Sequence, residues 1–135
     1  MAMGQAGAGA QILFVYNADG TLLARAADAV HKIVAPASYP CSLCSLSHGA
    51  LKMRRDWPAL LAGLPLPAQV LHRDEFAAAF GDHAFPWPAV LLHRGKAMEE
   101  LVGAAQLGRL PDLPALDAAV RRELAARGIG VSPPP

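Results

Sequence analysis

Four short segments of strand length, each rich in apolar residues, constrain the fold of this 135-residue chain more than any other feature. They cover residues 11–16, 68–72, 89–93 and 97–102. The first is rich in β-branched and aromatic residues, which favour a strand over a helix of the same length. The last two are separated by Arg94-Gly95-Lys96, a short glycine-containing turn that predicts an antiparallel hairpin.

Apolar residues at three- and four-residue spacing predict helices around these strands. We expect helical segments over residues 22–34, 41–52, 57–61, 75–80 and 105–110, and a last helix from Pro114 to just before Gly128. Asp56 and Asp74 stand where the third and fourth of these begin, and we expect both to act as capping residues. Strands and helices therefore alternate along most of the chain.

The composition predicts a single compact domain. Hydrophobic residues make up 53% of the chain, charged residues 17%, and the mean hydropathy is +0.27. These values are too apolar for a disordered chain, and the apolar runs are too short to span a membrane. We expect a disordered leader over residues 1–10, one domain over 11–128 and a proline-rich tail over 129–135.

Charge and cysteine content exclude several classes of function. Twelve Lys and Arg against eleven Asp and Glu give a net charge of +1, which provides no field to attract nucleic acid or an anionic membrane. The first ten residues contain no Lys or Arg and are not typical of a secretory signal, so we expect a cytoplasmic protein with reduced thiols. The sequence also lacks a phosphate-binding P-loop, a nucleophile elbow and a zinc-protease motif.

The order of elements predicts a thioredoxin-like α/β domain, β-α-β-α-β-β-α, with a helical insertion after the first helix. Strands joined through helices are expected to be parallel, because right-handed crossovers dominate, and the final hairpin adds antiparallel strands. Pro88 directly precedes the third strand, where the thioredoxin-like fold carries a cis-proline loop, and only X-Pro bonds adopt cis at low cost.

Three segments carry a resemblance to a known family: FVYNADG at 14–20, HKIVAP at 31–36 and YPCSLCSL at 39–46. With LHRDEF at 71–76, they resemble a small uncharacterised bacterial family that has a Tyr-x-Cys-x-Leu-Cys motif. The resemblance covers most of residues 12–102. It implies no known activity. The chain departs from an ordinary thioredoxin because the Cys-x-x-Cys comes a full helix later than strand one.

Cys41 and Cys44 are the main candidates for chemistry. If Cys41 lies in the first turn of a helix, backbone N–H groups and the helix dipole stabilise its thiolate, and Cys44 is placed one turn later as the resolving thiol. Such a pair suits thiol–disulfide exchange. The alternative is that both are small buried hydrophobic residues.

A metal site is a second interpretation of the same cysteines. Cys41, Cys44 and His48 would share one face of a continuous helix, and two sulfurs with an imidazole suit zinc or copper. A closed zinc site needs a fourth ligand, for which His31 or Asp19 is available if the fold brings it near.

Five further residues are weaker candidates. Asn17 and Asp19 follow strand one, where Asp19 is either a helix cap or a proton acceptor for a thiol. Lys32 would lower a thiol pKa if it points toward the cysteines. Tyr39 flanks the dithiol, and Trp87 beside Pro88 either faces substrate or covers the core.

The leading functional hypothesis is therefore thiol–disulfide exchange with an unknown thiol or disulfide partner, with Cys41 attacking, Cys44 resolving and Pro88 shaping the facing loop. This hypothesis requires no cofactor. The alternatives are a zinc- or copper-binding module and a binding domain without chemistry, since a fold does not specify a function.

Overall fold

The structure, a computed structural model, describes residues 9–17, 43, 56–81, 83 and 85–130. The strands in these ranges are β1 (Ala10–Val15), β2 (Ala68–Leu71), β3 (Ala89–Arg94) and β4 (Ala97–Val102). The helices are α3 (Trp57–Gly63), α4 (Arg73–Phe80), α5 (Ala104–Leu107) and α6 (Leu113–Ala126). The described part of the chain is thus a mixed α/β fold, and each strand lies within one residue of its predicted bounds. The helices expected over 22–34 and 41–52 lie outside the described residues, except for Leu43, which is helical.

The strands form one mixed sheet in the order β2-β1-β3-β4. β1 and β2 are parallel, as expected for strands joined through helices, while β3 is antiparallel to β1 and to β4. Only one strand of the hairpin, β4, lies at the edge of the sheet. The other, β3, is an inner strand because it also pairs with β1. β1 therefore lies at the centre between a parallel and an antiparallel neighbour.

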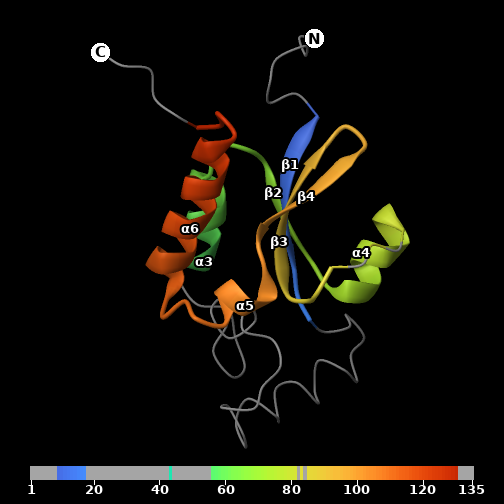
Figure 1. Cartoon of the computed structure of the whole chain (residues 1–135), viewed down its shortest axis with the longest axis horizontal. Coiled ribbons are helices and arrows are strands. Elements are labelled where there is room, and N and C mark those ends of the chain that lie inside the picture. Colours follow the sequence, from blue (N-terminus) through green and yellow to red (C-terminus); the bar gives the residue numbers. More distant parts are fainter. Residues whose placement is uncertain (1–8, 18–42, 44–55, 82, 84, 131–135) are drawn as a thin grey trace, which may run out of the picture.

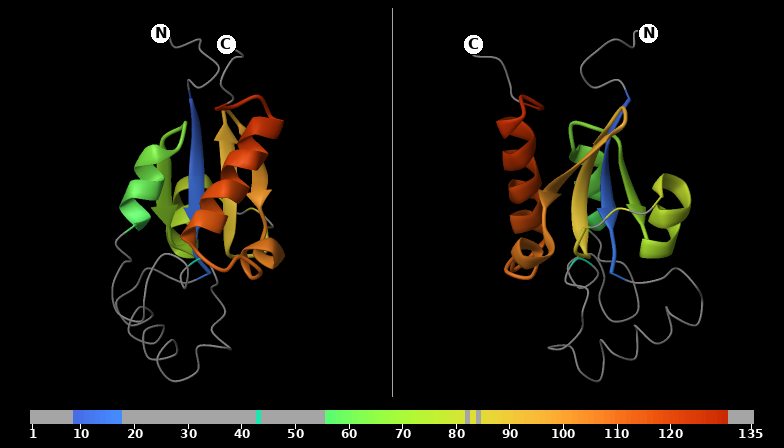
Figure 2. Two further views of the ribbon diagram at one scale, coloured as in Figure 1. Left: turned by 90° about the vertical axis from the view of Figure 1, so that its left-hand side faces the viewer. Right: turned by 45° about the vertical axis from the view of Figure 1, so that its right-hand side comes forward.

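Helices cover both faces of the sheet. Figure 1 shows α3 and α6 on one side of the strands and α4 on the other, and Figure 2 shows the same layers from two further directions. Because β1 is covered on both faces, its side chains are almost all buried, which explains the continuous apolar run in its sequence. We call the two sides of the sheet the α6 face and the α4 face.

The α6 face carries the larger part of the core. Alternate β1 residues Ile12 and Phe14 point to this side and pack with apolar residues of α3 and α6. Trp57, at the start of α3, is fully buried, and its ring meets that of Phe14 edge to face with centroids 5.2 Å apart. Leu43 belongs to the same buried cluster and has no exposed surface.

The α4 face carries a smaller core built around aromatic rings. Leu13, Val15 and Leu91 of the sheet are covered by Phe76, which is 1% exposed. Half-buried apolar residues surround this group: Leu71, Phe80, Phe85, Trp87 and Met98. This face is therefore only partly closed over its apolar residues.

The β3–β4 connection is a two-residue turn, with Arg94 paired to Ala97 across it. Gly95 has a φ of 55°, a left-handed conformation that glycine adopts without steric cost. The hairpin predicted from Arg94-Gly95-Lys96 is thus confirmed. Glu99 on β4 accepts hydrogen bonds from Arg94 at 2.7 Å and from Arg127, just after α6, at 3.1 Å, which links the hairpin to that helix.

One of the two expected helix caps, Asp74, is wrong, and the other, Asp56, is confirmed in position but not in its side-chain bond. Asp56 occupies the N-cap position of α3, but its backbone is already helical and its side chain makes no capping hydrogen bond. Asp74 lies inside α4, whose N-cap is His72, so this helix begins two residues earlier than predicted. α6 begins just before Pro114, and its cap is Asp112, whose carboxylate accepts from the backbone N–H of Ala115 at 3.0 Å. In the described part of the chain, none of the helices combines the length and hydropathy required to cross a lipid bilayer.

Candidate functional site

Most of the residues that the sequence singled out lie outside the part of the chain that the structure describes. These are Cys41, Cys44, His48, His31, Asp19, Lys32 and Tyr39. The described candidates are Asn17, Trp87 and Pro88. Leu43, between the two cysteines in sequence, is described and buried.

The carboxyl ends of β1 and β2 meet at one edge of the sheet, because these strands are parallel. The backbone N–H of Tyr16 donates to the carbonyl of Leu71 at 2.9 Å and continues the pairing just beyond β1. Residues 16–17 leave β1 here, and residues 72–73 lead from β2 into α4. In open α/β sheets, ligands are bound at this edge.

His72 and Glu75 form a hydrogen-bonded pair at this edge, which we call the His72–Glu75 pair. Oε1 of Glu75 accepts from the backbone N–H of His72 at 2.7 Å and lies 2.8 Å from Nδ1 of the same residue. Hydrogen bonding from the His72 backbone, and then from its imidazole, lowers the pKa of Glu75 below its ordinary value. Because an ionised carboxylate can only accept hydrogen bonds, Nδ1 of His72 is the donor to Glu75.

Side chains that follow β1 pack directly against residues that follow β2. The Tyr16 ring, 5% exposed, meets the His72 imidazole edge to face with centroids 5.5 Å apart. Nη1 of Arg73 donates to Oδ1 of Asn17 at 2.9 Å. Asn17, a candidate from the sequence, therefore binds the residue next to the His72–Glu75 pair.

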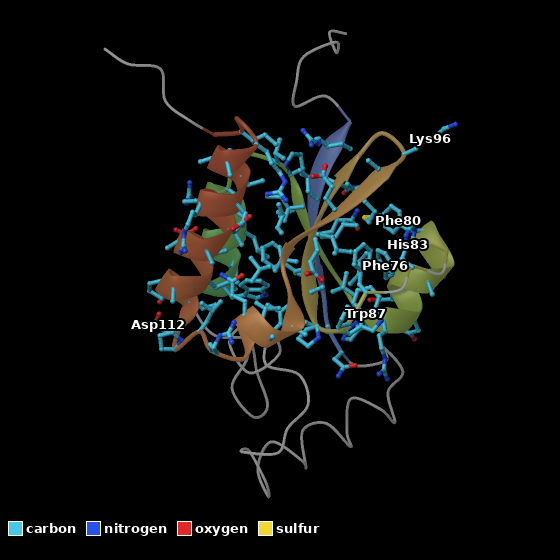
Figure 3. The ribbon with its side chains drawn as sticks, in the orientation of Figure 1. Phe76, Phe80, His83, Trp87, Lys96 and Asp112 are labelled. Atoms are coloured by element: carbon cyan, nitrogen blue, oxygen red, sulfur yellow. The ribbon has the colours of Figure 1, made fainter. Side chains whose placement is uncertain are left out.

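Trp87 and Pro88 lie on the segment that leads into β3. The peptide bond between them is cis, and Pro88 is buried. The half-buried Trp87 ring meets Phe76 of α4 with centroids 5.2 Å apart. Figure 3 shows Phe76, Phe80, His83 and Trp87 gathered between α4 and the sheet. Trp87 is thus packed on the core of the α4 face.

The sequence did not single out His72, Arg73 or Glu75 as site residues. A usable signal was present, since a polar residue followed by Glu three positions later is the spacing of a helix capping box. Nothing local reveals the contacts with Tyr16 and Asn17, which join residues 56 positions apart. Among the described residues, no three His, Cys, Asp or Glu side chains are grouped so as to hold a metal ion.

Comparisons of the chain with protein-family models, with curated proteins and with solved structures gave no match.

Proposed function

We propose that this chain is a thioredoxin-like domain that carries out thiol–disulfide exchange through Cys41 and Cys44. The reaction needs a protein or small-molecule disulfide as its oxidant. The proposal joins two lines of support: the arrangement of the sheet and the anchoring of the residue between the two cysteines.

The arrangement of the described elements is the one expected for a thioredoxin-like domain. A parallel pair, β1 and β2, is followed by an antiparallel hairpin, and helices cover both faces of the sheet. Pro88 is buried directly before β3, at the position where this fold carries its proline loop.

The burial of Leu43 is the single observation that carries the proposal. This residue is helical, has no exposed surface and belongs to the same core cluster as Phe14 and Tyr16 of the β1 segment. Both cysteines lie within two residues of it along the chain. A buried residue restricts the conformations of the chain on either side of it. Fewer conformations at a dithiol lower the entropic cost of bringing it into reaction with a partner.

The proposed exchange has two steps. The Cys41 thiolate attacks one sulfur of the partner disulfide, which forms a mixed disulfide and releases the other partner sulfur as a thiolate that takes up a proton. The Cys44 thiolate then attacks the Cys41 sulfur, so that the mixed disulfide breaks and the second partner thiol leaves. The partner gains two electrons, and the Cys41–Cys44 dithiol loses them by becoming a disulfide.

The test is the reduction of insulin disulfides in the presence of dithiothreitol, which restores the dithiol after each cycle. Wild-type protein and the control Ser42→Ala, which keeps both thiols, are expected to accelerate the reaction. Cys41→Ser is expected to abolish the acceleration. Cys44→Ser is expected to abolish turnover and to accumulate a mixed disulfide that is visible by mass spectrometry.

Three results would overturn the proposal. The first is an unchanged rate in Cys41→Ser, and the second is no acceleration by the wild-type chain. The third is a native mass in excess of the denatured mass that is lost equally in Cys41→Ser, Cys44→Ser and His48→Ala, which would instead support a zinc or copper site.

A further inference from the structure

We infer that Gln69, Gln11 and His93 form a pH-sensitive hydrogen-bond switch, in which protonation of His93 reverses the direction of hydrogen bonding across three strands of the sheet. These three side chains, which we call the glutamine–histidine row, lie on the α4 face near the start of β1. The switch does not depend on the proposed exchange at Cys41 and Cys44.

The row crosses β2, β1 and β3 through two side-chain contacts. Nε2 of Gln69 donates to Oε1 of Gln11 at 2.7 Å, and Nε2 of Gln11 lies 3.3 Å from Nδ1 of His93. The second contact joins two nitrogens, so it is a hydrogen bond only when Nδ1 has no proton and accepts from the Gln11 amide. The arrangement in the structure therefore requires a neutral imidazole whose proton is on Nε2.

Protonation of His93 is incompatible with this direction of bonding. A proton taken from solvent onto Nδ1 faces the Gln11 amide nitrogen, and two donors that face each other in a half-buried position are both left without an acceptor, which costs free energy. A half-turn of the Gln11 amide brings its Oε1 to Nδ1 and its Nε2 to Gln69. Gln69 must then turn as well, so that its Oε1 accepts from Gln11. All three side chains are again bonded, and both bonds run in the opposite direction.

Packing around the row restricts the imidazole while leaving the outer amide free to turn. The His93 and Phe80 rings meet edge to face with centroids 5.0 Å apart, and Met98 lies opposite His93 on β4. Gln11 and His93 are half-buried and directly opposite each other in the β1–β3 register, whereas Gln69 is exposed. The row thus runs from a partly covered imidazole to a side chain in contact with solvent.

The elements around His93 carry several charged and titratable groups: Asp74, Glu75, His83, Arg94, Lys96, Glu99 and Glu100. Arg94 and Glu99 bind each other on the α6 face. The Glu100 carboxylate lies against Gly103, and His83 bonds to the Phe80 carbonyl. The two acidic residues of α4 are in its first turn, whereas Phe80 is its last residue, and Lys96 extends outward from the hairpin turn (Figure 3). The polar group that contacts Nδ1 of His93 is therefore the uncharged amide of Gln11.

Reversal changes what the outer end of the row presents to solvent. With neutral His93, Oε1 of Gln69 is free to accept a hydrogen bond. With protonated His93, the same oxygen is bound to Gln11 and both amide protons of Gln69 are free. Because β2 is an edge strand and Gln69 is exposed on it, proton uptake on β3 changes an acceptor into a donor at the opposite edge of the β2-β1-β3 part of the sheet.

The experiment is an NMR titration of the nitrogen-15-labelled full-length chain between about pH 5 and 8, the range in which histidine ordinarily changes its charge. It follows the His93 imidazole and the side-chain amides of Gln11 and Gln69, with Gln106 of α5 as an internal control outside the row. We expect both amides of the row to shift with the midpoint of His93, and the Gln69 amide protons to move toward the position of an unbonded amide. Gln106 should not follow this midpoint.

Variants test whether the signal passes through Gln11. Gln11→Met removes the central amide but keeps an unbranched side chain of similar length, so His93 should still titrate while the response of Gln69 disappears. His93→Leu should abolish the response of both glutamines. His83→Asn is the matched control, because it replaces a histidine outside the row, and it should leave the response unchanged. Urea unfolding establishes that each variant is folded.

Three results would show that the row is not a switch. The first is a Gln69 amide that stays constant in the wild type while His93 titrates, which would mean that only the bond from Gln11 to His93 breaks. The second is a His93 imidazole that does not change its protonation over this range. The third is a Gln69 response that persists in a folded Gln11→Met variant. The first two need no variant, and none of the three bears on insulin reduction, which Cys41→Ser tests separately.

Discussion

On the α6 face of the sheet, eighteen of the described residues form one buried apolar cluster, whereas on the α4 face only five do. The larger cluster is made of aliphatic residues with Phe14, Tyr16 and Trp57, and helices α3 and α6 close it. The smaller one is covered by the eight-residue helix α4 and is surrounded by half-buried rings. Hydrophobic burial scales with the area removed from water, so the α6 face supplies most of the stability.

The α4 face also carries a row of hydrogen-bonded polar side chains across three strands. Gln69 donates to Gln11 at 2.7 Å, and the Gln11 amide nitrogen lies 3.3 Å from Nδ1 of His93, so that a polar ladder crosses β2, β1 and β3. The His93 ring also meets Phe80 with centroids 5.0 Å apart. A face with half-buried rings and titratable groups is open to recognition and chemistry, while the opposite face serves to hold the sheet together.

The strongest test of this difference is Trp57→Ala. Trp57 has no exposed surface and meets Phe14 in the larger cluster, so we expect a loss of about 3–5 kcal/mol in the free energy of unfolding. Urea denaturation followed by far-ultraviolet circular dichroism measures it. If Trp57→Ala loses no more free energy of unfolding than Phe80→Ala, a half-buried residue of the α4 face, then the α6 face does not supply most of the stability.

Phe76→Ala tests whether the α4 face depends on one ring. Phe76 is 1% exposed and meets Phe80 and Trp87 with centroids 5.4 and 5.2 Å apart. We expect a loss of about 3 kcal/mol, against about 1 kcal/mol for the control Phe80→Ala. Equal losses for the two variants would show that the half-buried rings contribute as much as the buried one.

Asp112→Ala addresses the anchoring of α6. Its carboxylate accepts from the Ala115 N–H at 3.0 Å, and the loss of such a cap costs about 1 kcal/mol. Asp112→Asn keeps an acceptor and is expected to remain close to the wild type. Thermal unfolding distinguishes the two; similar midpoints for the alanine and asparagine variants would argue against a capping role.

Glu99→Gln is expected to have the smallest effect and to depend on pH. Hydrogen bonding from Arg94, and then from Arg127, lowers the pKa of Glu99 below its ordinary value of 4.5. These ion pairs therefore stabilise the fold above that ordinary value, and their contribution disappears as the pH falls through the folded-state pKa. Because these groups remain partly exposed to solvent, we expect a loss of only about 0.2–1 kcal/mol at neutral pH.

Urea unfolding of wild type and Glu99→Gln over a pH series checks this prediction. The difference between them should shrink toward zero in acid, because the wild-type carboxyl then becomes neutral as well. A difference that is constant over the whole series would assign the effect to altered packing and not to charge.

The sequence was sufficient to predict the strands, the hairpin and α6, because each has a local signal of its own. The run at 89–92 is continuously apolar, and Gly95 supplies the turn. The sequence was not sufficient for the start of α4, because its pattern places His72 at the end of a strand. In the structure, His72 is the N-cap of α4, and its backbone N–H donates to the carboxylate of Glu75, three residues later. This side-chain interaction favours a helix start over a continued strand.

The candidate site was predicted less well than the fold. The contact between Tyr16 and His72, and the bond from Arg73 to Asn17, form only because two strands distant in sequence lie parallel. No local sequence pattern predicts such a contact. The predicted dithiol and metal ligands stay predictions, because they lie outside the described residues.

The sheet order also has a kinetic consequence. Leu92 pairs with Glu99 across a two-residue turn, whereas Gln11 and Gln69, bonded between β1 and β2, are 58 positions apart in sequence. Contacts between distant residues form late, since the chain loses much entropy before they are made. Gln11 and His93, paired between β1 and β3, are 82 positions apart. We therefore expect the β3–β4 hairpin to assemble early and the pairings of β1 with β3 and with β2 to form later, so that Leu92→Ala slows refolding while Val70→Ala mainly accelerates unfolding in stopped-flow measurements. The edge that carries the His72–Glu75 pair, where β1 and β2 end, then belongs to the part of the sheet that is completed late.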